Sequence, residues 1–496
     1  MDKLYRFTMA FVGVMLVSML TPPHNSLTLN AQVATEQPPA KPSTVSASER
    51  IGLSLVIYNQ GIALVRDMRR ALIPAGEVVI DFPDVSPNMD FDSVEVSSTS
   101  APEAIQMAMH KLLANRPTPS ALLEKSIGKT VTIIRYAEDG SIVEKIEGQL
   151  LAVDGARPAT VKAGEKLLLY PPGMVVLSEM PEDMVLKPRL LVFAKSKETR
   201  MHNLSLTYIT SGLNWSTDYI ATISEEDSSM DLIGYANVQN NTDMSFPYAK
   251  LQLVAGVLRV LRDRAEFRRQ VEFARAAAPA PGEGIVTEEP FFEYHLYDIP
   301  QKVTLEGRGS LRLGIVSARG AKVEKQFVIT APGIVFDVRA REERLPTRIM
   351  INFVNEEKHG LGVPLPAGKV KLHKLGSDGR PIFIGEAPIA HIGKGQRVEL
   401  DIGGAFDIVG SWRQVKFTAL TAKEREVPVE VVITNGKEKE VIVQLRQPFG
   451  YGLEWEITQS SHEWKRRDAM TAEFTIPVPP SGKATLTFTA KVRLLP

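Results

Sequence analysis

Carboxylates are the side chains best suited by type to hydrolytic chemistry in this chain, and four of them lie in its C-terminal part. Glycoside hydrolysis needs two such groups facing each other across a cleft, one as the acid and one as the base or nucleophile. The four are Asp401, Asp407, Glu454 and Glu456. Nothing in their spacing pairs two of them, so an enzyme acting on glycan through a carboxylate pair is the alternative hypothesis.

The sequence has no motif for nucleophilic, metal-dependent or nucleotide chemistry. It contains no cysteine, and its eight histidines are scattered without a His-Glu-x-x-His helix. Residues 127–130 (IGKT) are similar to the end of a phosphate-binding loop, but Leu123 stands where that loop requires its first glycine. We therefore predict no catalytic residue, no metal ligand and no cofactor.

Aromatic side chains are the better candidates for binding. Aromatic faces stack on sugars and anchor protein partners, and three tryptophans and several tyrosines lie after residue 290. The candidate binding residues are Trp412, Trp455, Trp464 and Tyr297. Core packing is the alternative for each of them, because aromatics also dominate protein cores.

The charge of the chain argues against nucleic acid as a partner. Lys plus Arg total 58 and Asp plus Glu total 58, so the formal net charge is zero. One local segment is basic despite the overall balance of charge. It contains Arg262, Arg264, Arg268, Arg269 and Arg275. This run is either a polyanion-binding patch or a solvated loop or short helix, and the absence of interleaved aromatics favours the second.

The N-terminus has the features of an export signal. Lys3 and Arg6 precede an apolar run of 14 residues, 7–20, shorter than the roughly 20 residues that span a bilayer. Small residues near Ala31 offer a cleavage site. We predict a signal peptide over residues 1–31, with a retained anchor as the alternative, and no transmembrane span in the mature chain. The missing cysteines agree with an oxidising compartment, here the periplasm or outer cell envelope.

The elements that must position these residues are strands. Residues 204–256 contain four short runs in which apolar and polar side chains alternate, separated by polar turns at Gly212, at residues 225–229 and at residues 240–243. This pattern predicts an antiparallel meander with one apolar face. Because four strands alone leave that face open, strands after residue 292 are expected to complete a sandwich with it.

The rest of the chain divides by composition. We predict a disordered spacer (32–50), an N-terminal β unit with one helix at 102–115 (51–120), an inserted small β-barrel (121–180), the central meander (181–260), a flexible linker (261–290) and a C-terminal β-sandwich-like domain (291–496). Asn435-Gly436 predicts a hairpin between the apolar runs 429–433 and 441–445. The expected fold class is mainly β, a multi-domain antiparallel β-sandwich architecture with a small inserted β-barrel.

Six blocks of sequence follow one another along the chain. They are LTYITSGLNWSTDYIATI (206–223), FPYAKLQLVAG (246–256), YHLYDIPQKVTL (294–305), LGVPLPAGKV (361–370), FIGEAPIAHIGKGQRVEL (383–400) and AFDIVG (405–410). Together they resemble a bacterial exported family of unknown function whose domain forms the C-terminal part of mucoidy-inhibitor-like proteins. The resemblance covers residue 51 to the C-terminus and is strongest from residue 204.

What the resemblance implies is an all-β, envelope-facing protein linked to exopolysaccharide or surface behaviour, without catalytic residues to transfer. The resemblance implies a β domain that a long coiled coil interrupts, as in mucoidy-inhibitor-like proteins. Residues 120–177 of this chain are instead expected to form several short strands. The expected function is therefore a non-catalytic binding or scaffold protein whose partner is an envelope polysaccharide or protein. An enzyme acting on cell-envelope glycan is the alternative.

Overall fold

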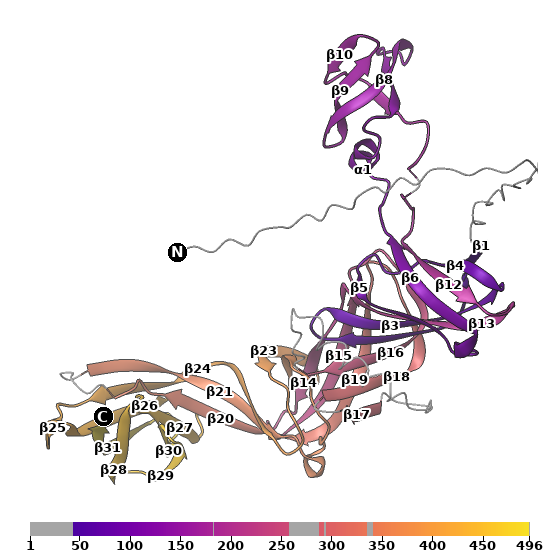
Figure 1. Cartoon of the computed structure of the whole chain (residues 1–496). Helices are drawn as coiled ribbons and strands as arrows, with labels where there is room; N and C mark the ends of the chain where they lie inside the picture. The colour runs from indigo at the N-terminus through magenta and orange to yellow at the C-terminus, as the bar shows by residue number, and fades with distance from the viewer. Residues whose placement is uncertain (1–42, 182, 257–286, 292–293, 335–340, 496) are drawn as a thin grey trace, which may run out of the picture. The chain divides into compact units, whose positions relative to one another are not determined.

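The computed structural model describes residues 43–181, 183–256, 287–291, 294–334 and 341–495, with the backbone alone for 287–291. Strands make up most of this described chain, as Figure 1 shows along the colour gradient. They form five sheets. The prediction of a mainly β, multi-domain sandwich architecture is confirmed.

A seven-stranded and a four-stranded sheet share one core. Their strand orders are β17-β18-β16-β2-β3-β13-β5 and β1-β4-β12-β6. Leu55, Ile80, Val192 and Leu206 belong to the same buried cluster, so the two sheets pack face to face. The strands are β1 (Ser43–Ser46), β2 (Glu49–Tyr58), β3 (Ile62–Ile73), β4 (Gly76–Pro83), β5 (Met89–Ser98), β6 (Ile105–Leu113), β12 (Arg189–Ser196), β13 (Arg200–Ser211), β16 (Phe246–Ala255), β17 (Thr287–Phe291) and β18 (Tyr294–Leu305).

A module with its own small core is inserted between β6 and β12. Its helix α1 begins at Pro119, where the Thr118 hydroxyl accepts a hydrogen bond from the Ala121 amide and caps the first turn. The chain enters and leaves at neighbouring positions, joined by a backbone bridge between Asn115 and Met184. The elements are α1 (Pro119–Glu124), β7 (Thr130–Tyr136), β8 (Ile142–Asp154), β9 (Arg157–Ala163), β10 (Lys166–Leu169) and β11 (Met174–Val176).

The five strands of this module were expected, but their closure into a barrel is not observed. The order β10-β9-β8-β7-β11 leaves β10 and β11 as the two edges of an open sheet. β10 and β11 are only 4 and 3 residues long. Strands this short provide few backbone groups for a pairing that would close the sheet.

Two further sheets carry the remaining strands. A five-stranded sheet has the order β19-β15-β14-β22-β23, and a ten-stranded sheet has the order β28-β31-β26-β24-β21-β20-β27-β30-β29, with β25 paired to β26. The first contains β14 (Leu213–Ile223), β15 (Ser229–Asn240), β19 (Ser310–Lys322), β22 (Gly368–Leu375) and β23 (Pro381–Ile389). The second contains β20 (Glu324–Thr330), β21 (Arg341–Val354), β24 (Arg397–Gln414), β25 (Thr418–Ala419), β26 (Glu424–Asn435), β27 (Val441–Pro448), β28 (Leu453–Ser460), β29 (Trp464–Asp468), β30 (Thr471–Val478) and β31 (Lys483–Leu494).

Strands β21 and β24 contribute to two separate cores. Leu345 of β21 and Trp412 of β24 are buried with the strands of the ten-stranded sheet. Phe353 of β21 and Leu400 of β24 are buried with β14, β15 and β22. The paired ends Val354 and Arg397 therefore lie where the ten-stranded sheet meets the core of the five-stranded one.

The meander predicted for residues 204–256 is wrong, although its four strands are present as β13 to β16. Only β14 and β15 pair with each other within this stretch of the described chain. β13 pairs with β3 and β5, and β16 pairs with β2 and β18. The expected pairing with strands after residue 292 is confirmed by β15 with β19 and by β16 with β18.

Two local predictions are also wrong. Residues 102–115 form a short 3-10 helix, η1 (Pro102–Ala104), and then β6, because the edge of β12 supplies backbone partners that outweigh helical propensity. β26 and β27 are not a hairpin: they pair with β31 and β30, respectively. The Asn435 amide instead donates to the carbonyls of Lys439 and Pro479 and holds the chain as it crosses between strands.

Several predicted segments fall wholly or partly outside the described residues. The signal peptide (1–31) and the basic run at 262–275 lie outside them, as does most of the linker. Residues 43–46, expected in the spacer, form β1 beside β4, and residues 287–290, expected in the linker, belong to β17. In the part of the chain that the structure describes, no helix combines the length and apolar character needed to cross a membrane.

A buried ion cluster lies inside the first sandwich. Asp67 is fully buried, and it accepts two hydrogen bonds from Arg50 at 2.9 Å and two from Arg69 at 3.1 and 2.7 Å. Arg69, 2% exposed, also donates to the carbonyls of Ala47 and Pro83. One carboxylate thus compensates two guanidinium groups, and the cluster links the segment before β2, β2, β3 and the end of β4.

We expect Asp67→Asn to lower the free energy of unfolding by about 3–5 kcal/mol, because it leaves the buried Arg69 and the partly buried Arg50 without their counter-ion. Chemical denaturation measures this. The matched control is Glu49→Gln, whose partner Arg70 is exposed, and whose effect is expected to stay below about 0.5 kcal/mol. Equal effects of the two substitutions would contradict the assignment.

Candidate functional site

Three of the four candidate aromatics are core residues, so the prediction that they bind a ligand is corrected. Trp412 is 0% exposed, and its indole N–H donates to Gln447 Oε1 at 2.9 Å. Trp455 donates to the carbonyl of Ala469, and the Tyr297 hydroxyl to the carbonyl of Pro364. Buried rings whose polar atoms are already bonded within the protein have no face left for a partner.

Trp464 is the exception. It lies on β29, an edge of the ten-stranded sheet, and remains 37% exposed. Its ring lies 6.1 Å from that of Trp455 and 6.5 Å from that of Phe474, so one side packs on the core. It offers part of one ring face to solvent.

The four carboxylates proposed for hydrolysis are not brought together in a described pocket. Asp401 pairs with Arg348 at 2.8 Å, Asp407 with Lys437 at 3.1 Å, and Glu454 with Arg493. Glu456 lies opposite Lys491 in the register of β28 and β31. Neither of the two pockets described below is lined by any of them. No group of three or more His, Asp or Glu suited to a metal ion occurs in the described ranges.

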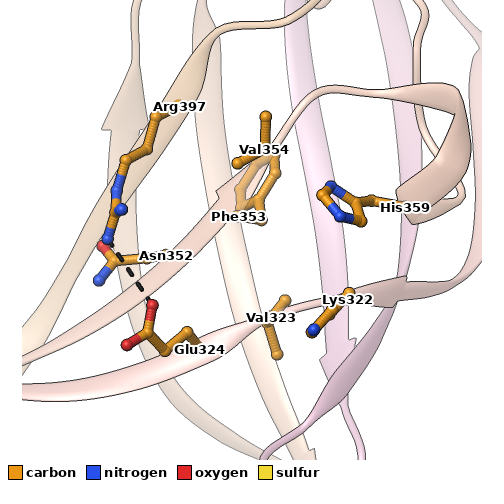
Figure 2. Close-up of a pocket in the computed structure, with 8 residues that line it drawn as sticks. All are labelled: Lys322, Val323, Glu324, Asn352, Phe353, Val354, His359 and Arg397. Atoms are coloured by element: carbon orange, nitrogen blue, oxygen red, sulfur yellow. Dashed lines mark ion pairs between the residues drawn. The ribbon is translucent and has the colours of Figure 1, made fainter.

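A pocket of about 140 Å³ lies where the paired ends of β21 and β24 meet the junction of β19 and β20. Figure 2 shows Arg397, Asn352 and Glu324 on one side, His359 and Lys322 on the other, and Phe353 and Val354 between them. The lining residues are Lys322, Val323, Glu324, Asn352, Phe353, Val354, His359 and Arg397. His359 belongs to the short 3-10 helix η2 (Glu357–His359).

Asn352 is the unusual member of this pocket. Its side chain is buried, with 2% exposure, yet neither Oδ1 nor Nδ2 has a hydrogen-bond partner among the described residues. It lies directly opposite Glu324 on β20 and Glu399 on β24. An unpaired buried amide costs about 1–3 kcal/mol, so its presence needs an explanation other than stability.

The charges that line the pocket leave it net positive. Arg397 lies 3.7 Å from Glu324 and 3.9 Å from Glu399, longer than hydrogen bonds. Glu324 accepts a shorter hydrogen bond, 2.6 Å, from Gln326. With Lys322 also lining the pocket and His359 counted as neutral, two cations face one carboxylate. The pocket therefore favours an anionic group.

An ion network beside the pocket pairs Glu399 with cations that do not line the pocket. Arg467 donates to Glu399 at 2.8 Å and to Glu473 at 2.8 Å, and Arg446 contacts both carboxylates at 3.2 Å. Burial alone raises the pKa of Glu473, but hydrogen bonds from Arg467, Lys465 and Arg446 outweigh it and lower that pKa. Burial also raises the pKa of Glu399, but Arg467 and Arg446 outweigh this effect and lower that pKa. Both groups are thus anionic and already occupied by protein cations.

A second pocket, of about 330 Å³, is charged but internally balanced. It is lined by Arg50, Arg116 and Lys187 together with Asp84 and Asp243. Arg50 is held by Asp67, Arg116 pairs with Asp243 at 2.6 Å, and Lys187 pairs with Asp84 at 3.0 Å. Its cations are therefore engaged, and the pocket at Asn352 is the stronger candidate binding site.

Sequence reasoning missed Asn352 and Arg397. One signal was present, since Asn352 stands between Ile351 and Phe353 inside an otherwise apolar run. A polar amide at that position of a strand with two cores is unusual. Arg397 had no signal, because the meeting of the β21 and β24 ends depends on the pairing of distant strands.

Comparisons with known proteins add no assignment: no family model matches the chain, and no curated protein sequence matches it.

The lowered pKa values predict acid sensitivity. The contribution of Glu473 is present above its ordinary value of 4.5 and is lost as the pH falls through the lowered pKa of the folded state. We expect Glu473→Gln to reduce the free energy of unfolding by about 2 kcal/mol at neutral pH, and by less at about pH 3. Denaturation at both pH values measures the difference.

Glu430→Gln is the matched control for this substitution. Its partner Arg413 is half-exposed, so we expect little change at either pH. A loss for Glu473→Gln that is independent of pH would contradict the assignment of the network as ionised.

Proposed function

We propose that this chain is an exported, non-catalytic binding or scaffold protein of the bacterial cell envelope. The observation that carries the proposal is the pocket at Asn352, in which a buried amide without a partner in the described residues and two cations face an open space. The pocket has groups that hold a ligand. It lacks the two facing carboxylates that hydrolysis of a glycosidic bond requires.

The export signal at residues 1–31, cleaved near Ala31, supports a location in the periplasm or outer envelope. The six sequence blocks support membership of the exported family found as the C-terminal part of mucoidy-inhibitor-like proteins, and with it a link to exopolysaccharide or surface behaviour. An envelope polysaccharide or an envelope protein is the proposed partner. Both classes present polar and anionic groups that a positively charged pocket binds.

We expect the mature chain, from about residue 32 by the position of the cleavage site, to be retained saturably by purified envelope fractions without releasing sugar. Retention and reducing ends are measured in the same tubes. Asn352→Leu is expected to weaken retention about tenfold, since the amide supplies ligand hydrogen bonds. Thr347→Val is the control: Thr347 is also buried and lacks a hydroxyl partner among the described residues, and it lies on β21 away from the pocket.

One outcome would overturn the binding function, and a second would overturn its assignment to this pocket. Time-dependent release of reducing ends would make the chain an enzyme on envelope glycan and direct attention to its carboxylates. Equal retention of the wild type and Asn352→Leu would show that binding uses another surface.

A further inference from the structure

The geometry of the pocket points to a ligand class, and this inference rests on the proposed binding function. We propose that the pocket binds the carboxylate end of an acylated α-amino acid, as at the C-terminus of a peptide. Three groups carry the inference: the Asn352 amide, the Arg397 guanidinium and the competing Glu324 carboxylate.

The Asn352 amide determines which hydrogen-bonding groups the ligand must carry. A carboxamide presents one acceptor and one donor side by side, and the ligand must offer the reverse pair. An extended amino-acid residue does so, since its N–H and its own carboxyl oxygen point to the same side, as in a β-ladder. Asn352 Oδ1 then accepts from the ligand N–H, and Nδ2 donates to one carboxylate oxygen.

The positive charge of Arg397 determines that the ligand group beside it is anionic. Arg397 is opposite Val354 in the register, diagonal to Asn352, a separation of about 7–8 Å that a long side chain spans. Figure 2 shows both side chains on the same side of the pocket. The guanidinium takes the second carboxylate oxygen, the partner for which its planar donors are best suited. Lys322 adds a second positive charge.

The Glu324 carboxylate competes with the ligand carboxylate for Arg397. Glu324 lies 3.7 Å from Arg397 and repels an incoming carboxylate. Gln326 already donates to Glu324 at 2.6 Å, so Glu324 keeps a partner when the ligand takes Arg397. Glu324 therefore reduces affinity, and its neutralisation is expected to increase it.

The test is a ligand-observed NMR titration of the intact protein with three small probes. N-acetylglycine carries both the carboxylate and the amide. N-acetylglycinamide lacks the charge, and propionate lacks the amide. We expect saturable binding of N-acetylglycine with a Kd of about 1 mM, as its few atoms allow, and at least about tenfold weaker binding of the other two. A tripeptide with a free C-terminus is expected to bind at least as tightly as N-acetylglycine.

Variants separate a binding role from a structural one. Asn352→Leu is expected to raise the Tm of the free protein, because it removes an unpaired buried amide, and to weaken N-acetylglycine binding about tenfold. Thr347→Val is expected to raise the Tm without changing binding. Arg397→Gln is expected to weaken binding about tenfold, whereas Arg413→Gln, on the same strand, leaves it unchanged. Glu324→Gln is expected to tighten it several-fold.

Failures of the two proposals are distinguishable. No saturable binding of N-acetylglycine, or equal binding of N-acetylglycinamide, overturns the ligand class. If Asn352→Leu nevertheless loses envelope retention, the binding function stands with another ligand. A lowered Tm for Asn352→Leu with unchanged probe binding would make Asn352 a structural residue and overturn the inference.

Discussion

The fold depends on backbone pairing between strands that lie far apart in sequence. β16 pairs in parallel with β2, about 200 residues earlier, and β14 pairs in parallel with β22. Each parallel pair requires the intervening chain to cross over and return. Because β14 and β16 gain these partners only from distant segments, the two sheets that contain them cannot form from consecutive strands alone. The ends of β21 and β24 pack against the core that contains β14 and β22, so their position depends on this pairing.

The sequence predicted strands well and their partners poorly. Alternation of apolar and polar side chains in residues 204–256 identified β13 to β16, because period 2 depends only on which face is buried. It carries no information on the neighbouring strand, so a meander was predicted where β13 pairs with β3. In residues 102–115, apolar side chains spaced as on a helix belong instead to β6, where pairing with β12 decides the conformation. Asn435-Gly436 failed for the same reason, since its flanking strands pair elsewhere.

The candidate site shows a different limit. Trp412, Trp455 and Tyr297 were chosen by residue type, but in a protein with several cores large rings are used first for burial. Asn352 was overlooked because a single asparagine within a strand matches no sequence motif. What distinguishes it is the combination of burial, unpaired polar atoms and a nearby guanidinium, and only the folded chain places these together.

The inserted module illustrates how such a fold can acquire new parts. Its entry and exit are bridged at Asn115 and Met184, on the connection between the paired strands β6 and β12. Its core, with Leu123, Ile133 and Leu150, is separate from that of the sandwich. Segments whose ends are close and whose cores are independent are those that tolerate exchange. This connection is therefore a natural grafting point, where a reporter or a foreign binding domain could replace the module without cutting the host sheets.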